Sequence, residues 1–279
     1  LPAGTVDVVR RALEEDLAHG PDVTTLATIP ADAVSVAHVV TRGPGVVAGL
    51  QVAETVFAHA SDGRLRCVPL VRDGDRVAPG DVLMTVEGPT AALLTAERTA
   101  LNFLTMLSGV ATLTRSVVDA VEHTGVQVRD SRKTLPGLRT LQKYAVRCGG
   151  GTNHRMGLGD EALLKDNHIA AAGSLTAALH AVRALAPDVP VEVECDTLDQ
   201  VAEAIGAGAT LILLDNMSLD QVRAAVGLAD GRVRLEVSGK LDLASAHAAA
   251  ETGVDYLALG ALTHSAPALD IGLDLSSAS

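Results

Sequence analysis

The residues of this chain best suited to bind a charged small molecule lie between Asp130 and His168, in DSRKTLPGLRTLQKYAVRCGGGTNHRMGLGDEALLKDNH. The whole protein has a formal net charge of -12, yet cations exceed acidic residues in this segment. A local cationic excess interrupted by glycines indicates a pocket for a small polyanion, because a nucleic-acid surface usually makes a whole domain basic. The cations are Arg132, Lys133, Arg139, Lys143, Arg147, Arg155 and Lys165, and the acidic residues are Asp130, Asp160, Glu161 and Asp166.

A second interpretation covers part of this segment. Arg139, Lys143 and Arg147 recur every four residues, which is the spacing of one exposed helix face. These three residues are therefore interpreted as solvated, and the others as the pocket.

The second half of the chain alternates strand and helix patterns from Val126 onward. Alternating units of this kind imply parallel strands buried on both faces, either closed as a barrel or open as a doubly wound sheet. The predicted strands are VQVRD ending at Asp130, EALLK ending at Lys165, VEVEC ending at Cys195, LILLD ending at Asp215, RLEVS ending at Ser238 and YLALG ending at Gly260.

Polar or small residues stand at the carboxyl end of these strands, with Arg132 and Lys133 just beyond the first. In a β/α barrel that rim is where chemistry is assembled, and the loops after the last strands commonly bind phosphate. The strand-end residues are Lys165, Glu194, Asp215, Ser238 and Gly260.

The two strand-end carboxylates, Glu194 and Asp215, suit Mg²⁺ or sugar hydroxyls. The plainer interpretation is that they pair with Lys165 or Arg132. Ser238-Gly239 and Gly260-Ala261 offer backbone N–H groups for phosphate, although small residues at strand ends also serve simple turns.

The first part of the chain predicts an α+β unit whose strands cluster without regular alternation. From Thr90 to about Val121 the pattern is helical, in one helix or in two broken near Gly109, and this segment marks the domain boundary. The other predicted elements are helices over Thr5–Ala18 and Gln51–Ala60, and strands over Val34–Thr41, Val46–Ala48, Leu65–Val71 and Val82–Val86.

Composition limits the class of protein. At 279 residues and 48% apolar content, the chain can bury a large core. No long apolar run and no signal peptide are evident, and Cys67, Cys148 and Cys195 have no disulfide or zinc spacing, so a cytoplasmic protein with reduced thiols is expected. With 1% aromatic residues, a base-stacking surface is not expected.

Two short patterns are given plainer interpretations. Gly157, Gly159 and Ala162 form the pattern GxGxxA. A dinucleotide site needs a strand before this pattern and a helix after it, and neither is predicted here. His154 and His168 lack neighbours at metal-ligand spacing, so hydrogen-bonding roles are favoured.

Several long strings together resemble the quinolinate phosphoribosyltransferase family. They are DSRKTLPGLR, GGGTNHR, LLKDNHI, ERTALNFL at 97 to 104, the VEVE and LLDN segments, and ALGALTHSAPALDIGLD. The resemblance covers nearly the whole chain. It implies an α/β fold: an N-terminal α/β sandwich domain over 1–110 and an incomplete α/β (TIM-like) barrel over 111–279, with the C-terminal strand returning to the first domain.

The resemblance also implies transfer of a phosphoribosyl group from phosphoribosyl pyrophosphate (PRPP) to quinolinate, with decarboxylation, in NAD biosynthesis. It implies catalytic Lys133, Glu194 and Asp215, with Mg²⁺ or Mn²⁺ on the two carboxylates, and a head-to-tail homodimer with shared active sites. The substrate-binding residues that it implies are Arg98, Arg132, Thr134, His154, Arg155, Lys165, Ser238, Gly239, Lys240, Gly260 and Ala261. Lys240 departs from the family pattern, which usually has glycine or asparagine there.

Three alternatives stay open. A lysine-dependent aldolase would use Lys165 as a desolvated amine at a strand end. A phosphoribosyltransferase acting on nicotinate would need fewer cations and no decarboxylation. A non-catalytic sugar-phosphate binder would have no need for Glu194 and Asp215 beside so many cations.

Overall fold

The computed structural model describes residues 1–239 and 241–276, which form two compact units. The boundary falls inside a long helix, α4 (Thr90–Val121), after Arg115. The predicted ranges were 1–110 and 111–279, and the structure adds two later segments to the first unit. Of the described residues, the first unit holds 1–115, 135–150 and 265–276, and the second holds 116–134, 151–239 and 241–264.

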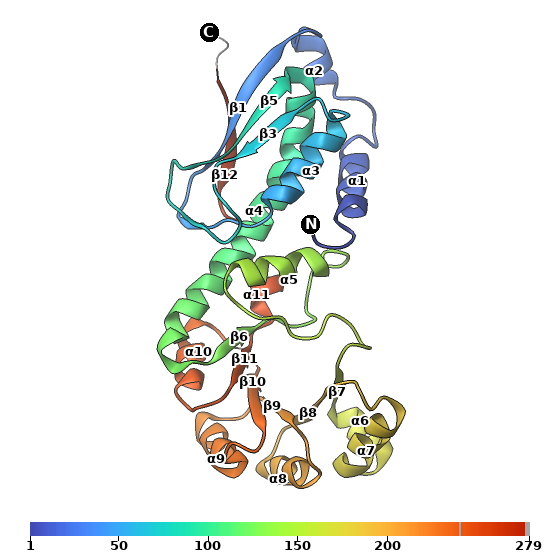
Figure 1. Cartoon of the computed structure of the whole chain (residues 1–279), viewed down its shortest axis with the longest axis vertical. Helices are drawn as coiled ribbons and strands as arrows, with labels where there is room; N and C mark the ends of the chain where they lie inside the picture. The colour runs from blue at the N-terminus through green and yellow to red at the C-terminus, as the bar shows by residue number, and fades with distance from the viewer. Residues whose placement is uncertain (240, 277–279) are drawn as a thin grey trace. The chain divides into compact units, whose positions relative to one another are not determined.

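An antiparallel sheet forms the frame of the first unit, with the strand order β12-β1-β5-β3 (Figure 1). The C-terminal strand β12 pairs with β1 from Thr41 opposite Ile271 to Val36 opposite Ser276, so the chain ends in the unit where it began. A short pair, β2 (Gly45–Val46) and β4 (Arg76–Val77), lies outside this sheet. The sheet strands are β1 (Val34–Thr41), β3 (Arg66–Pro69), β5 (Val82–Pro89) and β12 (Ile271–Ser276).

Helices cover this sheet with apolar faces. α3 (Leu50–Ala60) buries Val52, Val56 and Phe57 completely or nearly so. Two hydroxyls of α4 then fix the loop before α3, because the N–H groups of Val46 and Ala48 donate to Thr112 Oγ1 (2.9 Å) and Ser108 Oγ (3.0 Å). The remaining helices of the unit are α1 (Thr5–Asp16), α2 (Val23–Thr28) and α5 (Arg139–Cys148).

The long helix α4 runs without interruption through Gly109, so the alternative of two helices is wrong. Gly109 instead allows the backbone of Pro267 to pack closely against α4, because a Cβ at this position would lie 2.1 Å from the carbonyl oxygen of Pro267. By length and hydropathy this helix could cross a membrane, but 56% of its apolar window is buried within the protein. That burial is typical of the core helix of a globular domain.

Helix α5 corrects one prediction about the basic segment. Lys143 was predicted to be exposed together with Arg139 and Arg147, but its side chain is fully buried. Arg147 is exposed and Arg139 is half-buried. The four-residue spacing was therefore misleading, because the middle of α5 is buried nearly all the way round, at Leu141, Lys143 and Val146 among others.

The second unit is built on six parallel strands in the order β6-β11-β10-β9-β8-β7. β6 and β7 stand at opposite ends of this order and do not pair among the described residues, so the sheet is open, as the incomplete barrel requires. Three of the strands have the predicted bounds. The strands are β6 (Gln127–Arg129), β7 (Ala162–Leu164), β8 (Val191–Cys195), β9 (Leu211–Asp215), β10 (Arg234–Ser238) and β11 (Tyr256–Ala258).

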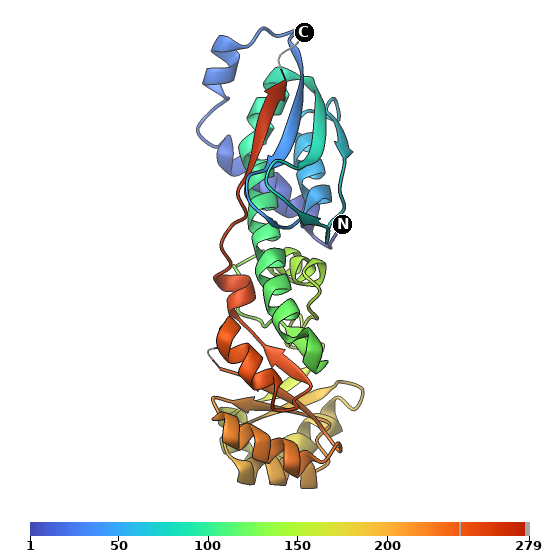
Figure 2. The same ribbon diagram turned by 90° about the vertical axis from the view of Figure 1, so that its left-hand side faces the viewer.

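Helices lie on the outer face of these strands, as Figures 1 and 2 show. Several begin with side-chain caps: Thr197, Ser218 and Asp242 each accept from the backbone N–H three residues later. The elements are η1 (Glu122–Thr124), α6 (Asp166–Ala172), α7 (Leu175–Leu185), α8 (Leu198–Gly206), α9 (Leu219–Ala229), α10 (Leu243–Ala250) and α11 (Ala261–His264).

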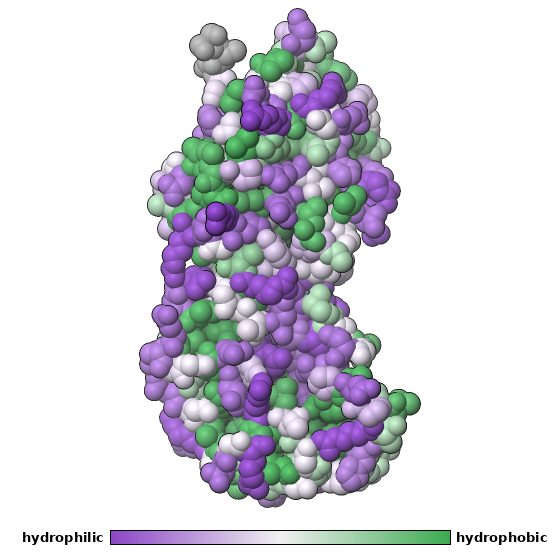
Figure 3. All heavy atoms as spheres, in the orientation of Figure 1, coloured by the Kyte–Doolittle hydropathy of each residue, from purple (hydrophilic) through white to green (hydrophobic). Residues whose placement is uncertain are grey.

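The surface and the thiols indicate an ordinary globular protein. Hydrophilic and hydrophobic residues are interspersed over the face drawn in Figure 3. The three cysteines are free, and burial raises the pKa of Cys67 and Cys195 to about 12 and that of Cys148 to about 11. None of these thiols has the lowered pKa of a reactive cysteine.

We predict that Gly109→Ala destabilises the protein, because its Cβ would collide with the Pro267 carbonyl at 2.1 Å. The expected loss in the free energy of unfolding is about 1–3 kcal/mol. Gly227→Ala in α9 is the matched control, since nothing lies within 4 Å of its Cβ, and it should stabilise by about 0.5–1 kcal/mol. Urea denaturation measures both, and equal effects would contradict the close approach at Gly109.

Candidate active site

A cavity of about 240 Å³ opens at the carboxyl ends of the parallel strands of the second unit. Most of the residues predicted from the sequence line it. The lining consists of Ser131, Arg132, Lys133, His154, Arg155, Leu163, Lys165, Glu194, Leu213, Asp215, Glu236, Ser238, Ala258 and Gly260.

Strand register explains why these side chains converge. Ser238 lies opposite Asp215 in the β10–β9 pair, and Glu194 lies opposite Leu213 in the β8–β9 pair. Because the strands are parallel, residues at the end of each strand share one edge of the sheet. The Glu194 carboxylate, the Ser238 hydroxyl and the Lys165 amine therefore lie at the same edge because of the strand arrangement alone.

Lys165 and Glu194 form an ion pair at this edge, with Nζ 2.5 Å from Oε2. Lys165 follows β7 directly and begins α6, where its backbone N–H donates to Nδ1 of His168 (3.0 Å). His168 thus fixes the backbone of Lys165, which agrees with the hydrogen-bonding role predicted for it.

Arg132 and Arg155 bring two guanidinium groups to the cavity. Burial, and next the charge of Arg132, lower the pKa of Arg155. The Nη1 of Arg155 donates to the backbone carbonyl of Glu161 (3.0 Å), which braces the guanidinium at one side. Two close cations at one cavity wall suit an anion with more than one carboxylate.

Lys133 lies close to Gly260, just after strand β11. Thr263 Oγ1 donates to the Lys133 carbonyl (2.8 Å), which ties the loop after β6 to α11. A Cβ at Gly260 would lie 3.0 Å from Cδ of Lys133, so a larger residue there would displace the lysine chain.

Asp215 and Gly239 form the next part of the rim. Asn216 Nδ2 donates to Asp215 Oδ2 (2.7 Å) and thereby orients the carboxylate. Gly239 has φ +110°, and a Cβ there would lie 2.5 Å from Asn216 Oδ1, so the position requires glycine.

Some predicted site residues are not part of this lining. Thr134, Gly239 and Ala261 each follow a lining residue in the chain without lining the cavity themselves. Lys240 lies outside the described residues. Arg98 belongs to the first unit, where it lines a separate cavity of about 330 Å³ with Glu15 and other residues of α1 and α4.

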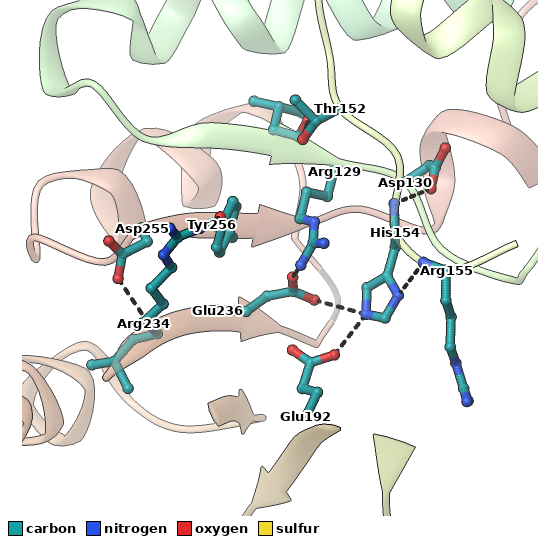
Figure 4. Close-up of polar contacts among 12 residues, drawn as sticks. Arg129, Asp130, Thr152, His154, Arg155, Glu192, Arg234, Glu236, Asp255 and Tyr256 are labelled. Atoms are coloured by element: carbon teal, nitrogen blue, oxygen red, sulfur yellow. Dashed lines mark hydrogen bonds and ion pairs between the residues drawn. The ribbon is translucent and has the colours of Figure 1, made fainter. Parts of the chain in front are cut away.

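The cavity wall continues into a buried polar network, of which sequence reasoning named only His154 (Figure 4). Arg129 Nη1 donates to Glu236 Oε2 at 2.7 Å, and the Arg129 guanidinium also stacks on the Tyr256 ring at 4.4 Å. His154 Nε2 lies 2.8 Å from Glu192 Oε2 and 3.5 Å from Glu236 Oε1. Both glutamates are fully buried.

Burial governs the charge of these two glutamates. Burial, and next the charge of Glu161, raise the pKa of Glu192 to about 8. Burial, and next the charge of Glu192, raise the pKa of Glu236 to about 7, against the opposing effect of His154 and Arg129. Two buried carboxylates that both approach the His154 ring cannot both be ionised cheaply, because little solvent screens them.

A sequence signal for this network existed. VEVEC places Glu192 two residues before Glu194, and RLEVS places Glu236 two residues before Ser238. An acidic residue inside a strand that is buried on both faces must have a buried partner. That rule, applied to the predicted strands, would have added Glu192 and Glu236 to the site.

Two groups of side chains in the described part of the chain could hold a metal ion by proximity. His154, Glu161 and Glu192 form one group, and His123, His247 and Glu251 form an exposed one, with ligand atoms within 4.8 Å in each. Neither group includes Glu194 or Asp215, the residues predicted to bind Mg²⁺.

Comparison with known protein families identifies the same family over both halves of the chain. Residues 22–108 match the family model described as quinolinate phosphoribosyl transferase, N-terminal domain, and residues 110–274 match that of the C-terminal domain. The chain belongs to the quinolinate phosphoribosyltransferase family. The resemblance stated from the sequence motifs is thereby confirmed.

Individual relatives agree with this assignment. The chain is 54% identical, over 274 residues and 96% of each sequence, to the nicotinate-nucleotide pyrophosphorylase [carboxylating] of Mycobacterium leprae (strain TN). It is 43% identical to the probable enzyme of that name from Bacillus subtilis (strain 168), covering 86% of this chain and 83% of the relative. The solved nicotinate-nucleotide pyrophosphorylase of Francisella tularensis superposes with a TM-score of 0.95 at 39% identity, covering 99% of this chain and 98% of that one.

We predict that Arg129→Met destabilises the protein in a pH-dependent way, because it leaves Glu236 buried without its cation. The pKa of Glu236 is already raised to about 7, so the folded state keeps a proton that the unfolded state releases above about pH 4.5. Stability therefore falls as the pH rises through this window, and the variant should extend the fall to higher pH.

The expected loss in the free energy of unfolding for Arg129→Met is about 3–5 kcal/mol at pH 8 and much less at pH 5. Urea denaturation at both pH values measures it. The double variant Arg129→Met/Glu236→Gln is the control and should recover most of the loss at pH 8. A loss of equal size at both pH values would contradict this charge balance.

Proposed function

We propose that this protein transfers the phosphoribosyl group of PRPP to quinolinate, releasing pyrophosphate and CO₂ and giving nicotinate mononucleotide for NAD biosynthesis. The names of its close relatives support the proposal, since they are nicotinate-nucleotide pyrophosphorylases and quinolinate phosphoribosyltransferases. The observation that carries it is one cavity lined by Arg132, Arg155 and Lys165 together with Asp215 and Glu194.

The cations suit the first substrate. Quinolinate is a pyridine with two adjacent carboxylates, and planar guanidinium groups can bind both oxygens of a carboxylate. Arg132 and Arg155 are close enough for Arg132 to lower the pKa of Arg155. A dicarboxylate between them would relieve that mutual repulsion, which supplies binding free energy for a dianion rather than a monoanion.

The other side of the rim suits the phosphoribosyl group. Asp215 and Glu194 can face the cationic ribose that develops as the pyrophosphate leaves, and Lys133 can neutralise the leaving group. Ser238 and Gly260 offer small side chains and backbone N–H groups to the 5′-phosphate. The pyridine nitrogen itself displaces the pyrophosphate at the anomeric carbon, so no protein nucleophile takes part.

Decarboxylation follows from the same arrangement. Once the ring nitrogen carries the ribose, its positive charge stabilises the carbanion that remains when the 2-carboxylate leaves as CO₂, and this carbon then takes up a proton from water. The protein contributes by holding the reacting groups in place and by electrostatic stabilisation, both of which act without a covalent intermediate.

Mg²⁺, or Mn²⁺ in its place, is part of this proposal. Asp215 offers a carboxylate at the rim, oriented by Asn216, and this oxygen donor fits a hard cation that also binds substrate phosphates. Glu194 is the weaker candidate, because it already pairs with Lys165 at 2.5 Å. When bound, the ion would neutralise the pyrophosphate of PRPP.

The alternatives fit less well. A nicotinate-specific transferase would leave one of the paired guanidinium groups without a carboxylate. An aldolase needs a free lysine amine to attack the substrate, whereas Lys165 is already paired with Glu194 at 2.5 Å. A binding protein without catalysis would not place Asp215 beside the phosphoribosyl side.

A direct assay tests the function. Purified protein with PRPP and Mg²⁺ should release pyrophosphate and CO₂ in equal amounts from quinolinate and little pyrophosphate from nicotinate. Excess EDTA should abolish turnover, and Mg²⁺ or Mn²⁺, without zinc, should restore it. Preference for nicotinate, or full turnover in EDTA, would refute the corresponding part of the proposal.

We also propose a head-to-tail homodimer in which Arg98 completes the active site of the partner chain. Arg98 lies on α4 in the first unit, far along the chain from Arg132 and Arg155. A closed two-fold pair would then contain two identical shared sites.

We predict that Arg98→Ala and Arg132→Ala proteins, each nearly inactive, restore activity when mixed. Loss of one electrostatic contact should cost each variant about 100 to 1,000-fold. About half of randomly exchanged dimers are mixed and each has one intact site, so recovery should approach roughly a quarter of wild-type activity. Native mass spectrometry checks that subunits exchange; exchange without recovery would mean that Arg98 serves its own chain.

A further inference from the structure

A second group of ionisable side chains lies at the opposite end of the parallel sheet from the catalytic cavity. Strands β6 and β11 are parallel neighbours in that sheet. The chain enters each strand through the same Thr-Gly-Val sequence, at 124–126 and 252–254, whose glycines turn the backbone at φ +77° and +91°. The residues just before these two turns are His123 and Glu251, and the parallel strands therefore bring them side by side.

Helix α10 supplies a third side chain to this group. His247 lies in its last turn and Glu251 is its C-cap residue, so these two side chains, four residues apart, share one face of the helix. The imidazole rings of His123 and His247 have their centroids 5.3 Å apart. His123 Nε2 lies 2.5 Å from Glu251 Oε1. One donor atom from each of the three residues thus lies within 4.8 Å of the other two.

This spacing fits one tetrahedral metal ion. With bonds of about 2.0–2.2 Å, the donor atoms around such an ion lie roughly 3.4 Å apart, and the centres of two bound imidazoles lie roughly 5 Å apart. The centroid separation of 5.3 Å between His123 and His247 agrees with that value. The side chains of His123 and Glu251 are 55% and 50% exposed, so small rotations can bring their donor atoms to the required separation without repacking the core.

The donor atoms select the class of ion. Two imidazole nitrogens and one carboxylate oxygen suit Zn²⁺ and its neighbours Co²⁺, Ni²⁺ and Cu²⁺, whereas Mg²⁺ takes oxygen ligands. Three protein ligands leave the fourth tetrahedral position to water. The carboxyl end of α10 adds its partial negative charge, which favours a cation beside His247 and Glu251.

We propose that His123, His247 and Glu251 form a binding site for a divalent transition-metal ion of the zinc class. All three belong to the second unit, and none of them lines the catalytic cavity. The proposal is therefore independent of the proposed function.

A bound ion would join the two segments that lead into β6 and β11. β6 stands at one end of the strand order, with β11 as its neighbour. An ion held by η1 on one side and by α10 on the other would fasten this end strand to the sheet. Because the unfolded chain does not hold the three ligands together, the ion would stabilise the folded protein.

Metal titration tests the proposal against the plainer interpretation, which is an ion pair between His123 and Glu251 beside a second ring. Purified protein is dialysed against EDTA, freed of chelator and titrated with Co²⁺, followed by its visible absorption, and then with Zn²⁺. Wild type should bind one Co²⁺ at this site, and Zn²⁺ but not Mg²⁺ should displace it.

Variants of the three ligands locate the bound ion. His123→Ala, His247→Ala and Glu251→Gln should each weaken its binding at least about tenfold, since loss of a group that only orients a ligand already costs about 10–100-fold. His180→Ala is the matched control, because His180 is exposed on α7, and it should bind the ion as wild type does. Equal binding of Co²⁺ by wild type and all three ligand variants would overturn the proposal.

Thermal unfolding measures the stabilising effect without any turnover. Zn²⁺ at about 100 times its dissociation constant should raise the Tm of wild type by about 3–6 °C. His247→Ala should keep the Tm of the metal-free wild type within about 1–2 °C, because a surface substitution costs little, and should lose most of the rise with Zn²⁺. A rise of the same size in wild type and His247→Ala would show that the ion acts elsewhere, and the proposed site would be wrong.

Discussion

The buried ion pair between Arg129 and Glu236 is the interaction on which the rest of the site depends. Its two groups lie 2.7 Å apart with side-chain exposures of 12% and 0%. A parallel barrel interior is ordinarily filled by branched apolar residues, so charged groups there must be fully paired. The pair lets Glu236 lie in the interior, where Glu236 and Glu192 both lie beside the His154 ring.

The ionisable side chains of the second unit lie in two layers, each with both acidic and basic members. Carboxylates with raised pKa values lie in the interior, on Glu192 and Glu236. Cations lie at the rim above them, on Arg132, Arg155 and Lys165. The rim thereby attracts anionic substrates, while the interior charges hold the chain that carries the rim. Removing a rim cation should affect binding, whereas removing an interior charge should affect stability and geometry.

Much of this could be predicted from the sequence, for physical reasons. β8, β9 and β10 are short segments rich in Val and Leu that are mostly buried, so their ends at Cys195, Asp215 and Ser238 were evident. The residues that follow such ends must share one edge of the sheet, which placed Lys165 and Glu194 together. The family motifs supplied the identity of the substrates.

Other features depend on tertiary contacts that periodicity does not record. Lys143 looked exposed because three cations recur every four residues, but the burial of its helix face is set by packing within the first unit. Gly109 looked like a helix break, whereas its role is to admit the backbone of Pro267. Glu192 and Glu236 were passed over because attention went to strand ends rather than to acidic residues inside strands.

The most direct test of the account is a crystal structure of the protein with bound quinolinate. The account predicts that the two carboxylates contact Arg132, Arg155 and Lys165. Quinolinate bound elsewhere, with its carboxylates contacting none of these three side chains, would contradict it.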